Sequence, residues 1–194
     1  MTKARTQQRR VSNQLRIIGG KWRGRKLTFP DVDGLRPSGD RLREMLFNWV
    51  NFELPGSYCL DLFAGSGALG LEALSRGAAH ATLVELNDNA ARHLKQHCQT
   101  LSADNAIVVH NSALKWLDQS ANQKFDLVFL DPPFSQPLLE PACELLEQRQ
   151  WLTENALIYV ETPLHQAPKL PDNWQLIKEK HSGQVTCRLY QRSV

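Results

Sequence analysis

Four consecutive residues combine a carboxylate, two prolines and an aromatic ring: Asp131, Pro132, Pro133 and Phe134. They follow the apolar run 125–130, which predicts a buried strand. Proline fixes φ and donates no backbone hydrogen bond, so the carbonyl groups beside these prolines are held rigid and stay available as acceptors. Such a group of acceptors beside an aromatic face can hold a flat molecule that carries an amine. We therefore predict that these four residues are catalytic.

A second candidate site lies about sixty residues earlier, in a loop of small residues between a predicted strand and a predicted helix. Asp61 and Phe63 precede the run Ala64, Gly65, Ser66 and Gly67. Small residues beside a helix N-terminus let a ligand approach the backbone closely. Glu85 follows Gly65 by 20 residues, at the end of the next predicted strand, where a carboxylate can accept both hydroxyls of a ribose.

The loop fits more than one ligand. Gly65, Gly67 and Gly70 match the G-x-G-x-x-G pattern of dinucleotide sites. However, the carboxylate of Asp61 would repel a pyrophosphate, and it would attract a cationic ligand such as S-adenosylmethionine, which carries ammonium and sulfonium groups. NAD, another nucleotide, and a tight turn without any ligand stay open as alternatives.

The surrounding sequence predicts an α/β fold. Predicted strands cover 58–63, 81–85, 106–110, 125–130 and 156–161, and predicted helices lie between them at 68–76, 88–101, from 112, and 138–148. This alternation indicates a mostly parallel sheet with helices on both faces. The runs 174–180 and 185–192 predict an antiparallel C-terminal hairpin.

Three parts of the chain are expected. Residues 1–14 form a polar, basic arm, which we expect to be disordered. Residues 15–54 form an extension, with a hairpin at 15–30 and a helix that begins near Ser38 or Asp40. The buried face of that helix is predicted to contain Leu42, Met45, Leu46, Trp49 and Val50. Residues 55–194 form a Rossmann-like domain.

The net charge of +3 conceals an uneven distribution. Residues 1–26 hold nine Lys or Arg and no Asp or Glu, whereas the remaining residues hold 14 basic and 20 acidic side chains. A basic segment on a mildly acidic body favours a polyanion as partner. The alternative is a disordered tail that only improves solubility.

Other classes of protein fit less well. The chain has no apolar run of the ~18 residues that span a bilayer, and its N-terminus lacks the apolar core of a signal peptide, so we expect a cytoplasmic protein without a membrane anchor. The four cysteines form no C-x-x-C motif, which argues against a zinc or redox site and predicts buried free thiols. His93 and His97 are spaced for a metal, but they lack a third ligand, so we expect a solvated helix face and no metal site.

Four motifs resemble those of class I S-adenosylmethionine-dependent methyltransferases. The segment 61–67 is similar to their first motif, and 84–87 is similar to their ribose motif. Asn111, Ser112 and Ala113 fall where that superfamily contacts the adenine. Residues 131–134 match the (Asp/Asn)-Pro-Pro-aromatic motif of enzymes that methylate exocyclic amines of nucleobases.

A narrower resemblance covers residues 15–192. The segments 36–44 and 46–48 are similar to the N-terminal motif of the RsmD family, and 16–20 with 23–27 resembles that family's opening hairpin. Ser38 and Gly39 stand where the family usually has Thr-Ser. These bacterial enzymes methylate guanine N2 in 16S ribosomal RNA.

The resemblance implies a role for each matched position. S-adenosylmethionine would be the cofactor, bound by Asp61, Phe63, Ala64, Gly65, Ser66, Gly67, Glu85, Leu86, Asn111, Ser112 and Ala113. The partner would be 16S ribosomal RNA or the small ribosomal subunit. We expect a monomer that contacts RNA phosphates through Arg5, Arg9, Arg10, Arg23, Arg25, Arg36 and Arg41, with Arg43 as a further candidate.

Two rival functions stay open. A DNA adenine- or cytosine-amine methyltransferase would use the same acceptors, although the chain after residue 135 has room only to finish the sheet. A non-catalytic RNA-binding protein could also keep this fold, although it would have no need of the carboxylates of Asp61, Glu85 and Asp131.

Overall fold

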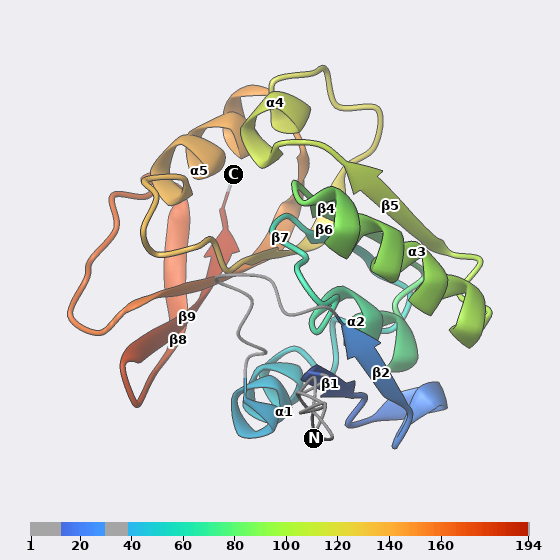
Figure 1. Ribbon diagram of the computed structural model, residues 1–194. Helices are drawn as coiled ribbons and strands as arrows, with labels where there is room; N and C mark the ends of the chain where they lie inside the picture. The colour runs from blue at the N-terminus through green and yellow to red at the C-terminus, as the bar shows by residue number, and fades with distance from the viewer. Residues whose placement is uncertain (1–12, 30–38, 194) are drawn as a thin grey trace, which may run out of the picture.

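A seven-stranded sheet forms the centre of the computed structural model, which describes residues 13–29 and 39–193 (Figure 1). The strand order is β5-β4-β3-β6-β7-β9-β8. The first five of these strands are parallel, and β9 runs antiparallel to both of its neighbours. The strands are β3 (Tyr58–Asp61), β4 (His80–Glu85), β5 (Ala106–His110), β6 (Phe125–Leu130), β7 (Leu152–Pro163), β8 (Trp174–Ser182) and β9 (Val185–Arg192).

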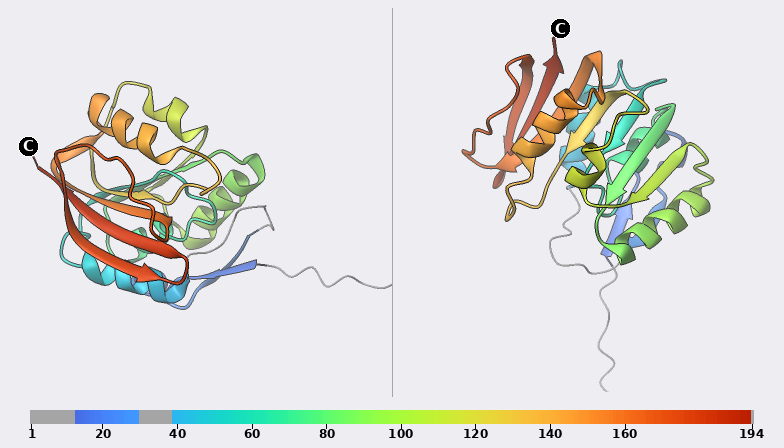
Figure 2. Two further views of the ribbon diagram at one scale, coloured as in Figure 1. Left: turned by 90° about the vertical axis from the view of Figure 1, so that its left-hand side faces the viewer. Right: turned by 90° about the horizontal axis from the view of Figure 1, so that it is seen from above.

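Helices cover both faces of this sheet, as two views at right angles show (Figures 1 and 2). On one face lie α1 (Asp40–Trp49), α2 (Gly70–Ser75) and α3 (Asp88–Leu101). On the other face lie α4 (Ala113–Leu117) and α5 (Leu139–Gln148). Alternate residues of each central strand enter the two cores: Leu127 and Phe129 of β6 face α1, whereas Val128 and Leu130 face α5. The predicted α/β architecture is confirmed.

The predicted N-terminal hairpin is also present. Strands β1 (Asn13–Arg16) and β2 (Lys26–Phe29) pair antiparallel, with a short 3₁₀ turn, η1 (Gly20–Trp22), between them. Leu15, Leu27 and Phe29 from this pair enter the same core as α1 and α2. The extension is therefore packed onto the central sheet and shares its core.

The buried carboxylate of Glu72 on α2 joins the hairpin to the sheet. It accepts hydrogen bonds from the backbone N–H groups of Ile18 (2.8 Å) and Gly19 (2.7 Å). Arg76 donates to it at 2.7 Å, and the guanidinium of Arg43 lies 3.5 Å away. A carboxylate that is fully buried needs such partners, because its charge has lost the stabilisation that water supplies.

Helix α1 starts where the sequence predicts, but it differs from its prediction in its N-cap and in part of its buried face. It begins at Asp40, and its N-cap is Gly39, with no side-chain cap; Ser38 lies outside the described residues. Its buried residues are Arg43, Leu46, Phe47 and Val50, while Leu42, Met45 and Trp49 are only partly buried. The predictions for Leu46 and Val50 are confirmed, while the rest of the buried face is shifted because the charged Arg43 is buried rather than exposed to solvent.

The expectation for one helix side chain is also corrected. His97 does not belong to a solvated face: it is buried, and its Nε2 lies 2.8 Å from the carbonyl oxygen of Thr28, because β2 packs against α3. The prediction of buried free thiols is confirmed for three of the four cysteines; Cys98 is also free but only half-buried. Within 13–29 and 39–193, no helix has the length and apolar character that a bilayer span requires.

Candidate active site at the carboxyl edge of the sheet

The residues predicted to do chemistry follow the carboxyl ends of neighbouring parallel strands. Asp61 ends β3, Glu85 ends β4, and Asp131 directly follows β6. In the sheet, β3 lies between β4 and β6, and Asp61 pairs with Leu83 on one side and Phe129 on the other. The carboxyl ends of parallel strands meet at one edge, and ligands of open α/β sheets bind there. The fold thus brings together three carboxylates that lie up to about seventy residues apart in the sequence.

The loop after β3 folds tightly around backbone hydrogen bonds. Gly65 and Gly67 have positive φ values of 52° and 81°. The N–H of Gly65 donates to Oε2 of Glu85 (2.8 Å), so the loop is tied to the end of β4. The positive φ of Gly67 favours glycine at this position, and a β-carbon there would also lie 2.6 Å from the side chain of Leu94.

Asp61 is buried under this loop. Only 3% of its surface is exposed, and its Oδ2 accepts a hydrogen bond from the N–H of Gly70 at 2.9 Å. Burial raises the pKa of this carboxyl to about 7; the bond from Gly70 lowers it, and the charge of Glu85 raises it further. A cation bound at this edge would favour the ionised form of Asp61.

The ends of β4 and β5 supply the remaining cofactor candidates. Glu85 is half-buried, and its Oε1 accepts the N–H of Asn87 at 2.6 Å, which fixes the carboxylate at the rim. Leu86 presents an exposed apolar side chain. The N–H of Asn111 binds the carbonyl of Glu85 at 3.1 Å, and its Oδ1 accepts the N–H of Ser112 at 2.8 Å. Asn111 and Ser112, both half-buried, therefore adjoin Glu85. Of the other cofactor candidates, Phe63 is half-buried, and three are buried: Ala64, Ser66 and Ala113.

The segment after β6 leaves the sheet as a rigid, largely exposed turn. Asp131 is half-buried and Pro132 is buried, whereas Pro133 is exposed and Phe134 has 47% of its surface exposed. The carbonyl of Pro133 accepts the N–H of Gln136 at 3.0 Å, which closes the turn. The aromatic ring is thus available to a partner outside the protein, and the carboxylate lies at its base.

Of the arginines predicted to contact RNA, Arg23, Arg25 and Arg41 are exposed, and Arg25 donates to the carbonyl of Thr100 at 3.4 Å. Arg5, Arg9, Arg10 and Arg36 lie outside the described residues. Arg43 is corrected: it is buried, pairs with Asp40 at 2.6 Å and donates to the carbonyl of Arg16 at 2.8 Å. Its guanidinium holds the hairpin against α1 and does not reach an RNA phosphate.

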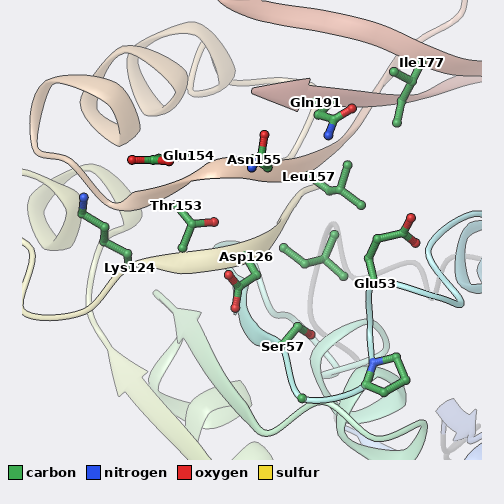
Figure 3. A pocket seen from close by; sticks show the side chains of 13 residues that line it. Glu53, Ser57, Lys124, Asp126, Thr153, Glu154, Asn155, Leu157, Ile177 and Gln191 are labelled. Atoms are coloured by element: carbon green, nitrogen blue, oxygen red, sulfur yellow. The ribbon is translucent and has the colours of Figure 1, made fainter. Parts of the chain in front are cut away.

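A pocket of about 750 Å³ lies at the opposite edge of the sheet. Figure 3 shows Ser57, Asp126 and Thr153 lining it, at or beside the amino ends of β3, β6 and β7. None of the predicted catalytic or cofactor residues borders this pocket. Its volume therefore does not identify the chemical site, which the carboxylates at the other edge indicate.

The sequence analysis missed one carboxylate at the active edge. Glu161 lies in β7, directly after Val160, which pairs with Leu130 of β6. It is 4% exposed, and the hydroxyl of Tyr159 donates to its Oε1 at 2.8 Å. The same rule that singled out Glu85, an acidic residue at the end of a predicted parallel strand, would have found it. Among 13–29 and 39–193, no cluster of three potential metal ligands occurs.

Comparison with known proteins places this chain in a family. The family model described as conserved hypothetical protein 95 matches residues 15–191. Ribosomal RNA small subunit methyltransferase D of Escherichia coli strain K12 is 53% identical over 182 residues, which cover 93% of this chain and 91% of that protein. The chain belongs to the RsmD family. As a member, it is a methyltransferase.

Further comparisons support the same family and the same fold. The ribosomal RNA small subunit methyltransferase D of Haemophilus influenzae is 51% identical over 184 residues, which cover 93% of this chain and 95% of that protein. A solved structure of yhhF from Escherichia coli is 50% identical, covers 93% of this chain and 99% of that chain, and superposes with a TM-score of 0.88. A Pyrococcus horikoshii structure at 15% identity and a TM-score of 0.61 shares the fold alone.

Proposed function

We propose that this methyltransferase transfers a methyl group from S-adenosylmethionine to the N2 amine of a guanine in 16S ribosomal RNA. The observation that carries the proposal is the shared edge of Asp61, Glu85 and the Asp131 turn, which joins a site for a cationic ribose-bearing ligand to a site for an amine. The names of relatives that are 51–53% identical support an RNA of the small ribosomal subunit as the substrate.

The residues at this edge fit S-adenosylmethionine. Asp61 would attract the ammonium and sulfonium charges, and the carboxylate of Glu85 would accept the ribose hydroxyls. Ala64 to Gly67 let the ligand approach the backbone, while Leu86 and Asn111–Ala113 would enclose the adenine. When bound, this cofactor supplies the methyl group: a bond from the methyl carbon to N2 forms as the methyl–sulfur bond breaks, and its electron pair stays on sulfur.

Asp131 would act first by orientation. The lone pair of the guanine amine is delocalised into the ring, which makes the amine a poor nucleophile. A carboxylate with an ordinary pKa of ~4 is too weak a base to deprotonate that amine beforehand. Asp131 and the carbonyl of Pro132 instead accept hydrogen bonds from the amine hydrogens and favour a pyramidal nitrogen, whose lone pair is localised and can point at the methyl group. Alignment of two reactants in this way can supply roughly 7–11 kcal/mol of the barrier.

The proton leaves after the new bond has begun to form. Bond formation makes the nitrogen positively charged and its hydrogens acidic, so Asp131 or water can then take one proton. The exposed ring of Phe134 would stack on the base, a contact worth roughly 1–3 kcal/mol per base in other systems. The target must stand outside a helix to reach this turn, so a flipped or looped nucleotide is implied.

The basic residues would hold the RNA backbone. Arg23 and Arg25 are exposed in or beside the hairpin, and Arg41 is exposed on α1. We infer that these residues, together with Arg5, Arg9, Arg10 and Arg36, bind phosphates. We further infer that the protein acts as a cytoplasmic monomer, with residues 15–54 as an RNA-contacting extension of the catalytic domain 55–194. Sedimentation at working concentration would test the monomer.

The decisive experiment is transfer of tritium from methyl-labelled S-adenosylmethionine. Small subunits from cells that lack this enzyme, and naked 16S ribosomal RNA, would be incubated with the full chain. Digestion to nucleosides should place the label in N2-methylguanosine. Label in adenosine or cytidine, in DNA alone, or in nothing would refute the proposal, and the ratio between particle and naked RNA would identify the preferred substrate.

A further inference from the structure

The active edge continues past Asp131 to a second carboxylate. Leu130 of β6 pairs with Val160 of β7, and each of these paired residues is followed directly by a carboxylate, Asp131 or Glu161. Neighbouring strands lie roughly 4.8 Å apart. Each carboxylate comes two residues after an aromatic residue, Phe129 or Tyr159, of the core under α1. Since side chains alternate along a strand, Glu161 faces the same side of the sheet as Tyr159, and the same alternation continued past Leu130 puts Asp131 on that side too.

Glu161 is held in a defined position. Its Oε1 accepts the hydroxyl of Tyr159 at 2.8 Å, and it pairs across the ladder with Cys187 of β9. Burial raises the pKa of the Cys187 thiol to about 12, and the charges of both Glu161 and Asp131 raise it as well. The thiol therefore lies within electrostatic reach of both carboxylates, which places the two carboxyl groups in one neighbourhood. A carboxylate held in this way is a fixed acceptor, so a ligand that presents a second acceptor to it is disfavoured.

The sheet order separates the two reactants. The proposed cofactor residues Asp61, Glu85 and Asn111 lie at the ends of β3, β4 and β5, all on one side of β6. A methyl donor bound there approaches Asp131 from the β3 side. A base that presents its amine to Asp131 must therefore extend its ring to the other side, over β7 and β9. The carboxylate at that position is Glu161.

We propose that Glu161, held by Tyr159, accepts the N1–H of the target guanine and thereby selects guanine. This inference rests on the proposed function. Guanine carries two donors side by side on its Watson–Crick edge, the N2 amine and N1–H. Two adjacent carboxylates match these donors, with Asp131 for the amine and Glu161 for N1–H. A base with a bare N1 acceptor would place a lone pair against the carboxylate, and sites built around such a hydrogen bond reject the mismatched analogue strongly.

The analogue 2-aminopurine tests this role, because it keeps the N2 amine but lacks N1–H. After the methylated position has been mapped, rRNA fragments with guanine or 2-aminopurine at that position would be compared. We expect the wild-type kcat/KM to favour guanine by at least ~100-fold. In Glu161→Gln, the side-chain amide can donate to a bare N1, so the preference should fall by ~10-fold or more. Tyr159→Phe should lower it by a few-fold, because Glu161 loses its partner.

Binding supplies a readout that does not depend on turnover. Competition between the two fragments, measured without cofactor, should show the same loss of guanine preference in Glu161→Gln. The matched control is Glu154→Gln, which removes an exposed carboxylate at the other end of β7 (Figure 3) and should leave the preference unchanged.

The outcomes separate the two proposals. A wild-type protein that methylates no guanine N2 refutes the proposed function. A wild-type protein that methylates guanine N2 but accepts 2-aminopurine equally well overturns only the role of Glu161. A Glu161→Gln variant that keeps the full preference for guanine over 2-aminopurine also overturns only the role of Glu161. If that variant does not fold, an unchanged preference in Tyr159→Phe overturns the inference.

Discussion

Asp61 and Asp131 are both aspartates at the carboxyl edge, yet their surroundings differ. Asp61 is almost fully buried and hydrogen-bonded to the N–H of Gly70, whereas Asp131 is half-buried at the base of an exposed turn. Burial penalises the charged form of a carboxyl and raises its pKa. The protonation of Asp61 therefore makes the stability of the fold depend on pH, whereas Asp131 is accessible to a substrate.

Asp61→Asn should stabilise the ligand-free protein above neutral pH. The pKa of Asp61 is raised from an ordinary 3.8 to about 7, so the folded protein holds a proton that the unfolded chain releases in that window. Stability therefore falls as pH rises from about 4 to 7. The advantage of the amide in urea unfolding should be on the order of 1–4 kcal/mol at pH 8 and should vanish near pH 4. A pH-independent difference would contradict this.

Asp131→Ala should lower the rate of methyl transfer by at least ~10²-fold, because the amine loses the acceptor that orients it. Cofactor affinity, measured by calorimetry, should stay within a few-fold of wild type. Asp126→Ala is the control, since it removes a carboxylate from the other end of the same strand. Substantial turnover by the Asp131 variant would remove this residue from the mechanism.

At the scale of elements, the hairpin and α1 are held to the sheet through α2. Glu72 contacts the hairpin backbone and the guanidinium of Arg43, and Ser75 accepts the N–H of Trp22 at 2.9 Å and donates to the carbonyl of Gly19 at 2.6 Å. Helix α2 begins at Gly70, which binds Asp61, so the same helix connects the cofactor edge to the extension.

Glu72→Ala should cost about 3–5 kcal/mol of unfolding free energy, since the buried Arg43 and the half-buried Arg76 both lose a carboxylate partner. Amide exchange at Ile18 and Gly19 should accelerate, because both lose their acceptor. Glu144→Ala, an exposed substitution on α5, should leave both measurements close to wild type. Unchanged exchange in the Glu72 variant would show that another contact holds the hairpin.

Gly20→Ala should destabilise the hairpin more than Gly24→Ala. Both glycines have positive φ, at 74° and 84°, so both substitutions impose backbone strain of about 1–2 kcal/mol. Only at Gly20 would the new β-carbon lie 1.8 Å from the carbonyl oxygen of Ser75; at Gly24 nothing lies within 4 Å. Urea unfolding of the two variants isolates the clash, and equal losses would contradict it.

At the scale of the whole molecule, the sheet order separates the proposed cofactor residues from Glu161, and the positive charge is concentrated in the N-terminal part. The β3–β4–β5 side carries the cofactor candidates, the β7–β9 side carries Glu161, and the turn after β6 lies between them. The basic excess is concentrated in residues 1–26, and the rest of the chain is net acidic. Phosphate contacts would therefore come mainly from the N-terminal part.

Deletion of residues 1–12, which leaves β1 intact, should weaken RNA binding and flatten its dependence on salt. The segment holds Lys3, Arg5, Arg9 and Arg10, and every phosphate that the shortened protein no longer binds should reduce the slope of log K against log salt by ~0.7–0.9. Binding would be titrated at several salt concentrations. Retained cofactor affinity is the control, and an unchanged slope would mean that the arm does not touch RNA.

The sequence by itself determined the alternation of strands and helices, the C-terminal hairpin, and the positions of Asp61, Glu85 and Asp131 at strand ends. Periodicity, glycines and prolines act over a few residues, so local reasoning reaches them. Those same features carried the family resemblance that the comparisons confirmed.

Only the tertiary structure decided the rest. Arg43 and His97 are polar residues on helices, and their burial depends on Glu72 and Thr28, which lie 29 and 69 positions away in the chain. Glu161 and Asp131 follow paired residues because β6 pairs with β7, across about thirty residues of sequence. Charge alone predicts exposure, but a buried partner that removes the cost of desolvation reverses it, and local sequence does not identify that partner.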